Sequence, residues 1–285
     1  MPASVTFHKY HGIGNDFILI EAPKGHPAWM TARVVTAWCD RHTGIGADGV
    51  LLIEPGQSAP FFMRVLNADG SEAEMCGNGI RCVAMHLHDR MGVTKEAIPI
   101  ETLAGVKTCR LTTDAAGQVE SVSVSLGRPL MSRSDVPMTG EGTTLRVPVI
   151  AGGRAFVGTG IGMGNPHFVV FDSVTEEEAA RFGAVISALP LFPRQTNVEF
   201  VCPVGENHFR VIVYERGCGL TLACGTGAAA TATAALLEGR AVSGRPILVD
   251  LPGGTLRLDV ATDLSDVVLT GQATYVFSGN IVSGE

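Results

Sequence analysis

Charged residues are scarce in this chain of 285 residues. Lys, Arg, Asp and Glu make up 17% of it, the net charge is −7, and the sequence has no run of basic residues. Nucleic acids and anionic membranes are bound through basic patches, so we expect neither as a partner. The hydrophobic share of 46% is that of a folded protein with a sizeable core, and the length suggests two domains.

Long apolar segments are lacking as well. The longest uncharged helical stretch, residues 225–237, is shorter than the roughly 20 residues that span a bilayer. Residues 1–7 have neither the charged start nor the apolar stretch of a signal peptide. We therefore expect a cytoplasmic protein that acts on a small molecule.

Metal and cofactor signatures are missing too. The seven cysteines are odd in number and form no Cys-x-x-Cys pair, which argues against a disulfide framework and a zinc site. The histidines suggest no set of metal ligands. Residues 44–49, Gly-Ile-Gly-Ala-Asp-Gly, match the dinucleotide pattern, but a helical segment precedes them and a strand follows, the reverse of what that motif requires. With no Walker A pattern and no lysine placed for a pyridoxal Schiff base, we expect no metal and no cofactor.

The sequence does contain one short motif that occurs twice. Cys76 and Cys224 each stand in a Cys-Gly-x-Gly segment that opens a predicted helix, and they lie 148 residues apart. A helix N-terminus lowers the pKa of a thiol from about 8.5, because the N–H groups and the helix dipole favour the thiolate. Glycines let a ligand approach those N–H groups. The alternative is two buried structural cysteines.

Other landmarks repeat at nearly the same offset. Residues 12–15, Gly-Ile-Gly-Asn, fall on residues 162–165, Gly-Met-Gly-Asn; Asn67 falls on Glu215, and Gly49 falls on Asn197. An internal repeat indicates two equivalent units. We predict an N-terminal domain of residues 1–117, joined by a returning strand within 272–285, and a C-terminal domain of residues 118–271. The two domains are related by a pseudo-twofold axis, with the active site in the cleft between them.

Hydrophobic patterning predicts an α/β (α+β) fold in which a mixed, mostly antiparallel sheet curls around a central helix in each domain. The central helices are predicted at 78–90 and 226–237; the second has no charged face and should be surrounded by protein. Surface helices are predicted at 31–41 and 176–189. Strands are predicted at 17–20, 50–53, 62–66, 122–126, 167–171, 197–201, 209–214, 247–249, 256–258 and 273–277.

Several polar residues accompany the repeat. Glu215 suits a substrate ammonium or the proton of a thiol, and Arg216 suits a second carboxylate; the alternative is an exposed ion pair on a strand end. Asn15, Asn165 and Asn197 suit a polar pocket, or else turns. His167 suits an auxiliary base beside a cysteine, or a structural role.

Motifs along nearly the whole chain resemble those of the diaminopimelate epimerase family. They are Lys9-x-His11-Gly12-x-Gly14-Asn15-Asp16-Phe17, residues 44–49, Asn67-Ala68-Asp69-Gly70-Ser71, Met75-Cys76-Gly77-Asn78-Gly79-x-Arg81-Cys82, Met163-Gly164-Asn165-Pro166-His167, Asn197-x-Glu199-Phe200-Val201, Tyr214-Glu215-Arg216-Gly217 and residues 221–228.

This resemblance implies a cofactor-independent epimerase of LL-2,6-diaminoheptanedioate, on the route to lysine and peptidoglycan, that acts as a homodimer. It implies that Cys76 and Cys224 exchange the α-proton with help from His167 and Glu215. The implied substrate-binding residues are Asn15, Asn67, Gly77, Asn78, Asn165, Asn197, Glu215, Arg216, Gly225 and Thr226. A racemase of another amino acid, such as proline or histidine, and a non-catalytic amino-acid-binding protein remain as alternatives.

Overall fold

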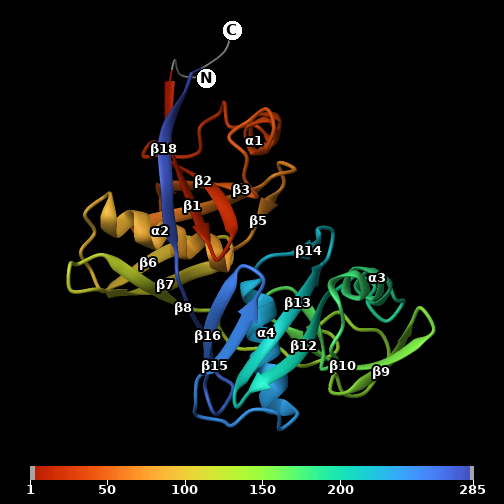
Figure 1. Ribbon diagram of the computed structural model, residues 1–285. Coiled ribbons are helices and arrows are strands. Elements are labelled where there is room, and N and C mark those ends of the chain that lie inside the picture. The colour runs from red at the N-terminus through yellow and green to blue at the C-terminus, as the bar shows by residue number, and fades with distance from the viewer. Residues whose placement is uncertain (1–3, 283–285) are drawn as a thin grey trace. The chain divides into compact units, whose positions relative to one another are not determined.

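The structure is a computed structural model that describes residues 4–282, and the chain divides into two compact units (Figure 1). Unit 1 comprises Met1–Val124 and Gly271–Glu285, and unit 2 comprises Ser125–Thr270. The last strand, β18 (Thr274–Val282), pairs antiparallel with the first, β1 (Ser4–Gly12). Among the described residues, none of the helices has the length and apolarity needed to cross a membrane.

Unit 1 is built mainly from strands, with a long helix and a short one. Besides β1 and β18 its elements are β2 (Asn15–Glu21), α1 (Ala32–Cys39), β3 (Gly49–Pro55), β4 (Phe61–Asn67), β5 (Glu72–Ala73), α2 (Gly77–Asp89), β6 (Ala97–Thr102), β7 (Gly105–Thr113) and β8 (Val119–Ser125).

Unit 2 has a similar set of elements, except that the strand paired with its first hairpin strand, β9, comes at its start, whereas the corresponding β18 comes last in unit 1. The elements of unit 2 are β9 (Val147–Ala151), β10 (Arg154–Gly162), β11 (Pro166–Val170), α3 (Glu176–Ser187), β12 (Asn197–Gly205), β13 (His208–Glu215), β14 (Gly219–Thr221), α4 (Gly225–Leu237), β15 (Ile247–Leu251), β16 (Gly254–Val260) and β17 (Val267–Gly271).

Strand pairing repeats between the units. In unit 1, β2 is parallel to β3 and β4 is parallel to β6; in unit 2, β11 is parallel to β12 and β13 is parallel to β15. The tight turns from β1 to β2 and from β10 to β11 each use a glycine with positive φ, Gly14 at 86° and Gly164 at 90°. The repeat read from the sequence is therefore a repeat of structure.

Helix α2 forms the centre of unit 1, where it packs against β1, β2, β3, β4, β6 and β7 (Figure 1). Ten of its residues are buried, including the fully buried Arg81. Its guanidinium donates to the carbonyls of Gly77 and Gln272 and to Asn78 Oδ1, so the interior charge has hydrogen-bond partners.

Helix α4 has the same position in unit 2 and packs against β10, β11, β12, β15 and β16. Its sequence of alanine, threonine and glycine leaves room for strands to approach closely, and ten of its residues are buried. The prediction of a protein-surrounded helix without a charged face is confirmed. All four predicted helices and all the predicted strands exist, and the sheet-rich α/β fold is as expected. The strands that the sequence did not predict include β1, β6, β7, β9, β10 and β17.

Candidate active site

Each cysteine caps the central helix of its own unit. Cys76 and Cys224 are the N-cap residues of α2 and α4, with nearly identical backbone angles (φ −135° and −129°, ψ 115° and 105°). Each sulfur accepts a hydrogen bond from the third helical residue, Gly79 N or Gly227 N, at 3.3 Å. An extended N-cap whose side chain accepts from the first turn is what starts a helix here. The thiols thus sit where the helix dipole is positive.

The glycines of these first turns leave no room for a side chain. A Cβ on Gly79 would lie 2.9 Å from Leu51 Cδ2, and one on Gly227 would lie 2.8 Å from Glu199 Oε1 and 3.2 Å from Cys224 Sγ. Strand side chains lie directly against both helix starts, so a larger residue would have to displace Leu51 at position 79 or Glu199 at position 227.

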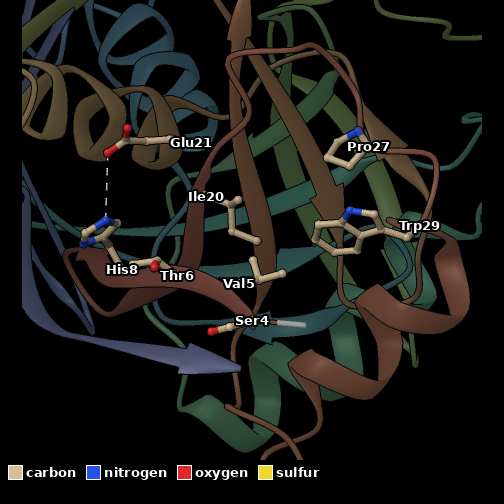
Figure 2. Close-up of a pocket in the computed structure, with 8 residues that line it drawn as sticks. All are labelled: Ser4, Val5, Thr6, His8, Ile20, Glu21, Pro27 and Trp29. Atoms are coloured by element: carbon tan, nitrogen blue, oxygen red, sulfur yellow. Dashed lines mark ion pairs between the residues drawn. The ribbon is translucent and has the colours of Figure 1, made fainter. Parts of the chain in front are cut away.

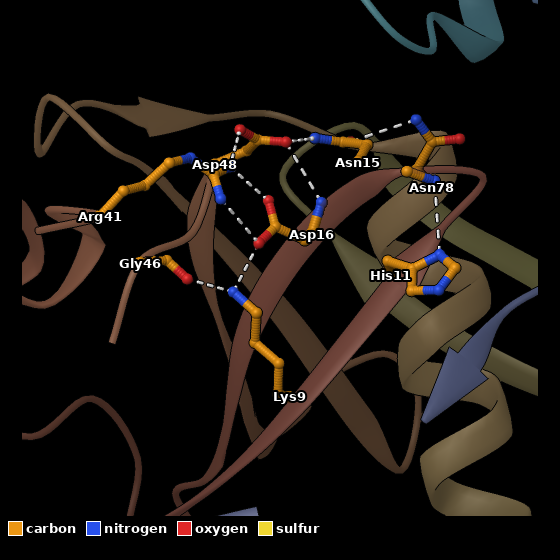
Figure 3. Close-up of polar contacts among 9 residues, drawn as sticks. Lys9, His11, Asn15, Asp16, Arg41, Gly46, Asp48 and Asn78 are labelled. Carbon is orange, nitrogen blue, oxygen red and sulfur yellow. Dashed lines mark hydrogen bonds and ion pairs between the residues drawn. The ribbon is translucent and has the colours of Figure 1, made fainter. Parts of the chain in front are cut away.

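Asn15 and Asn78 lie beside Cys76. Asn78 Nδ2 donates to Asn15 Oδ1 at 3.1 Å, and the Cys76 thiol is 3.9 Å from the same oxygen. The Asn15 amide in turn donates to Asp48 Oδ2 at 2.7 Å (Figure 3). Asn15 and Asn78, both predicted as substrate-binding residues, therefore lie next to Cys76.

An ion-pair network holds this side of unit 1 in place (Figure 3). Asp16 pairs with Lys9 and with Arg41, and Arg41 also reaches Asp48 at 2.8 Å. Burial raises the pKa of Asp16, but the two cations outweigh this and hold that pKa below its ordinary value. The Asp48 carboxylate also accepts from the Asp16 N–H, which gives Asp48 a structural role.

Asn67 is the last residue of β4, one residue beyond the strand predicted at 62–66. Its amide donates to Ser71 Oγ at 3.0 Å within the turn that leads to β5. The β3–β4 register places it opposite Gly49. The turn thereby fixes the direction of its side chain.

Two acidic residues and a threonine surround Cys224 in unit 2. Thr226 Oγ1 is 3.5 Å from the sulfur, and Glu215 accepts from Thr221 Oγ1 at 2.7 Å. Burial raises the pKa of Cys224 well above its ordinary value, and the negative charges of Glu215 and Glu199 raise it further. Hydrogen bonds from Thr226 and Gly227 act in the opposite direction but do not compensate. The sequence prediction of a lowered pKa is therefore wrong for Cys224.

His167 and Glu199 form a buried pair in unit 2. His167 Nδ1 lies 2.7 Å from Glu199 Oε1, and His167 Nε2 lies 2.9 Å from Asn165 Oδ1. Both members of the pair are completely buried. Burial raises the pKa of the Glu199 carboxyl, an effect that the adjacent imidazole partly opposes. Glu199 was assigned no role from the sequence. Its counterpart in the repeat, 148 residues earlier, is Leu51. A glutamate at a position where the other unit has a leucine is the signal by which it could have been found.

Asn197 and Arg216 are joined through the backbone. Asn197 Oδ1 accepts from the Arg216 N–H at 2.8 Å, which ties the start of β12 to the residue after β13. The exposed Arg216 side chain donates to the Arg194 carbonyl at 3.0 Å. A cation is thus held near the end of the strand that carries Glu215.

A second cluster in unit 1 was missed because its members come from β1, β2 and α2. Glu21 Oε1 is 3.0 Å from His86 Nε2 and 4.0 Å from His8 Nε2, and His86 Nδ1 is 3.1 Å from the Tyr10 hydroxyl. Burial and the nearby charge of Arg90 both lower the pKa of the two imidazoles. The same charge opposes a bound cation, so we interpret the cluster as a hydrogen-bonded network. It borders a surface pocket (Figure 2) lined by Ser4, Val5, Thr6, His8, Ile20, Glu21, Pro27 and Trp29.

The fold is shared with solved structures over almost the whole chain. A phenazine biosynthesis protein of the PhzF family from Bacillus anthracis has a TM-score of 0.70 at 14% identity, with 98% of this chain and 99% of that chain covered. A probable proline racemase from Agrobacterium radiobacter has a TM-score of 0.72 at 15% identity, with coverages of 98% and 93%. At these identities the likeness defines the fold class alone, that of the PhzF and proline racemase structures.

The family model for diaminopimelate epimerase matches residues 7–131 and 159–276. A diaminopimelate epimerase of Heliobacterium modesticaldum is 41% identical over 97% of this chain and 99% of its own length. One of Synechococcus sp. strain JA-3-3Ab is 44% identical, with coverages of 98% and 99%. The chain belongs to the diaminopimelate epimerase family, and the resemblance read from its motifs is confirmed.

Proposed function

We propose that this protein inverts the α-carbon of LL-2,6-diaminoheptanedioate to give the meso form, by proton transfer between two cysteines and without a cofactor. The observation that carries the proposal is the repeated helix start, since Cys76 and Cys224 each cap the central helix of a unit. The substrate is supported by the relatives named diaminopimelate epimerase.

Inversion at a carbon needs a base on one face and an acid on the other. The thiolate of one cysteine removes the α-proton while the thiol of the other delivers a proton to the opposite face. The two sulfurs exchange roles in the reverse reaction. Each unit supplies one of the two cysteines. A positioned acid or base contributes about 10²–10⁴-fold to the rate.

The two helix starts would stabilise the charge that develops on the substrate. The first-turn N–H groups of Gly77 and Asn78 in α2, and of Gly225 and Thr226 in α4, point along the helix axis toward its N-terminus. In our proposal they bind the carboxylate next to the reacting carbon, where one preorganised donor is worth about 2.7–4 kcal/mol.

The environment of Cys224 supports an assignment of roles in the free enzyme. Its raised pKa favours the thiol, so Cys224 is the proton donor in the first half of the cycle and Cys76 is the base. Glu215 and His167 assist: Glu215 raises the pKa of the thiol, and His167 is positioned by Glu199 near the start of β11.

The rest of the substrate would be held by the amides and by Arg216. Asn15, Asn165 and Asn197 are all fixed by hydrogen bonds that leave their amides oriented, and Asn67 is fixed by Ser71. Arg216 suits the distal carboxylate. We further propose a cytoplasmic homodimer that supplies lysine and peptidoglycan synthesis.

A racemase of another amino acid on the same fold is the alternative that the likeness to a probable proline racemase favours. The deciding experiment is a cofactor-free assay of the purified protein with LL-diaminopimelate, L-proline and L-histidine in parallel. We expect inversion of diaminopimelate only. Inversion of proline or histidine but not of diaminopimelate contradicts the proposed substrate. Binding of one enantiomer without inversion indicates a binding protein instead.

A further inference from the structure

The buried pair His167–Glu199 is a feature that the fold does not require. Both side chains are fully buried, and Glu199 Oε2 is buried without a hydrogen-bond partner among the described residues. Removing a carboxyl group from water without satisfying both of its oxygens is costly. A buried group kept at such a cost calls for a role outside folding.

Unit 1 shows the same positions filled by apolar residues. In the parallel pair β2–β3, Phe17 lies opposite Gly49; in the parallel pair β11–β12, His167 lies opposite Asn197. Two residues further along β3 and β12 come Leu51 and Glu199. Phe17 is 3% exposed and Leu51 is not exposed. In unit 1 a phenylalanine and a leucine therefore occupy the positions that a histidine and a glutamate occupy in unit 2.

Glu199 also lies against the helix start that carries Cys224. A Cβ on Gly227 would be 2.8 Å from Glu199 Oε1 and 3.2 Å from Cys224 Sγ, so the carboxyl and the sulfur flank the same glycine. At the equivalent place in unit 1, a Cβ on Gly79 would meet a methyl group of Leu51 at 2.9 Å. One cysteine has a carboxyl group beneath its helix start and the other has a hydrocarbon.

We propose that Glu199 is a positioning residue that makes the two cysteines chemically unequal: its carboxyl, held by His167 beside Cys224, adds to the burial and to Glu215 in favouring the thiol form of that cysteine in the free enzyme. This inference rests on the proposed two-cysteine function. The groups that act on Cys224 are Glu199 from β12 and Glu215 from β13. Helix α4 itself contains no titratable side chain, and His167 contacts Glu199 Oε1 at 2.7 Å.

The hydrogen-bond pattern shows how the pair is held together. Asn165 Oδ1 accepts, so His167 Nε2 carries a proton. The 2.7 Å contact between His167 Nδ1 and Glu199 Oε1 then contains one further proton. Our proposal requires that proton on the nitrogen, which leaves Glu199 as the anion beside Cys224. A glutamine at position 199 can donate to Nδ1 in the same place, while it has no charge at any pH.

The test measures the protonation of each cysteine by its alkylation. Wild type, Glu199→Gln and the double variant His167→Phe/Glu199→Leu, which copies the apolar pair of unit 1, are treated with iodoacetamide across a pH series without substrate. Mass spectrometry of the peptides separates Cys224 from Cys76. Access of the reagent sets the absolute rate, whereas the midpoint of the pH profile reports protonation.

In both variants we expect the Cys224 midpoint to fall by about one pH unit, so that Cys224 is alkylated about tenfold faster at pH values below both midpoints. The Cys76 midpoint should stay where it is, because its neighbour Leu51 is unchanged. Glu206→Gln is the matched control for net charge. Glu206 lies in the turn after β12, seven residues from Glu199, which is about 23 Å of extended strand, and this variant should leave both midpoints unchanged.

An unchanged Cys224 midpoint in a folded variant overturns the inference, and so does an equal fall for both cysteines. If the double variant does not fold, the near-isosteric Glu199→Gln variant decides alone. Because the measurement uses no substrate, its outcome is independent of the epimerase assay: a wild type that inverts no amino acid contradicts the proposed function, not the midpoint shift.

Discussion

The two helix-start glycines allow a paired perturbation in which equivalent substitutions should differ in effect. Ala replaces Gly227 in one variant and Gly79 in the other. Neither glycine has a positive φ, so alanine is compatible with both backbones. In both cases the new methyl group would approach another atom at 2.8–2.9 Å, closer than side-chain carbons normally come. The difference lies in which atom has to move.

At Gly227 the obstructing atom is Glu199 Oε1, which is fixed by its 2.7 Å contact with His167 and has no exposed surface. The helix start and the Cys224 sulfur must therefore shift by several tenths of an ångström. A displacement of about 1 Å at a reacting group costs on the order of 10²-fold in rate, so we expect Gly227→Ala to lower kcat by about 10- to 100-fold. Overpacking of about 1–3 kcal/mol is partly offset by the better helix propensity of alanine, about 1 kcal/mol.

At Gly79 the obstructing atom is the terminal methyl group of Leu51, which can rotate away. Gly79→Ala should therefore lose less than about tenfold in kcat, with a similar change in stability. The assay is kcat for diaminopimelate inversion of both variants, with thermal unfolding as the stability measurement. Equal losses of kcat, or a greater loss for Gly79→Ala, would refute the reasoning that the rigid carboxyl determines the position of Cys224.

Three further outcomes are expected. Cys76→Ala and Cys224→Ala should each lower inversion by at least about 10²–10⁴-fold while the circular dichroism spectrum is retained; inversion at a rate close to that of the wild type in either variant would contradict the two-base scheme. Burial lowers the pKa of His8 and His86, so the unfolded state binds more protons than the folded state. The free energy of unfolding should therefore fall as the pH drops below about 6.5. His86→Gln should make the free energy of unfolding depend less steeply on pH, and the same pH dependence in this variant and the wild type would exclude a contribution from His86. Ala232→Leu should lower the free energy of unfolding by about 1–3 kcal/mol because α4 is enclosed, and unchanged stability in urea would show that the helix has room.

The repeat in the sequence accounts for most of what could be predicted. Asn67 and Glu215 end equivalent strands, and the cysteines start equivalent helices, because landmarks in register mark equivalent places in a duplicated fold. The central helix of unit 2 was recognisable because a helix without a charged face must be enclosed.

The strands that were not predicted contain residue types that are unusual in strands. Strand β1 contains Lys9. Its ammonium group can be buried because it forms an ion pair with Asp16 and donates a hydrogen bond to the Gly46 carbonyl. Strand β10 is rich in glycine, a weak strand former, because the Phe168 ring and the Met138 sulfur occupy the space of side chains at Gly158 and Gly160. Such packing is invisible in local sequence patterns.

The protonation of Cys224 was missed for a related reason. The helix start that favours a thiolate is readable from Cys-Gly-x-Gly, but the burial that opposes it depends on strands distant in the sequence. Glu199, which lies on β12, acts on Cys224 only because the parallel strands bring it beneath α4.

The central claim, proton transfer between two sulfurs on opposite faces of a carbon, is tested most directly by the reaction in D₂O at low conversion. We predict that the meso product contains one deuterium at the inverted carbon from the first turnover, while the remaining LL substrate keeps its hydrogen. Product that retains the original hydrogen, or deuterium that appears equally in substrate and product, would show that a single base acts, and would contradict the claim.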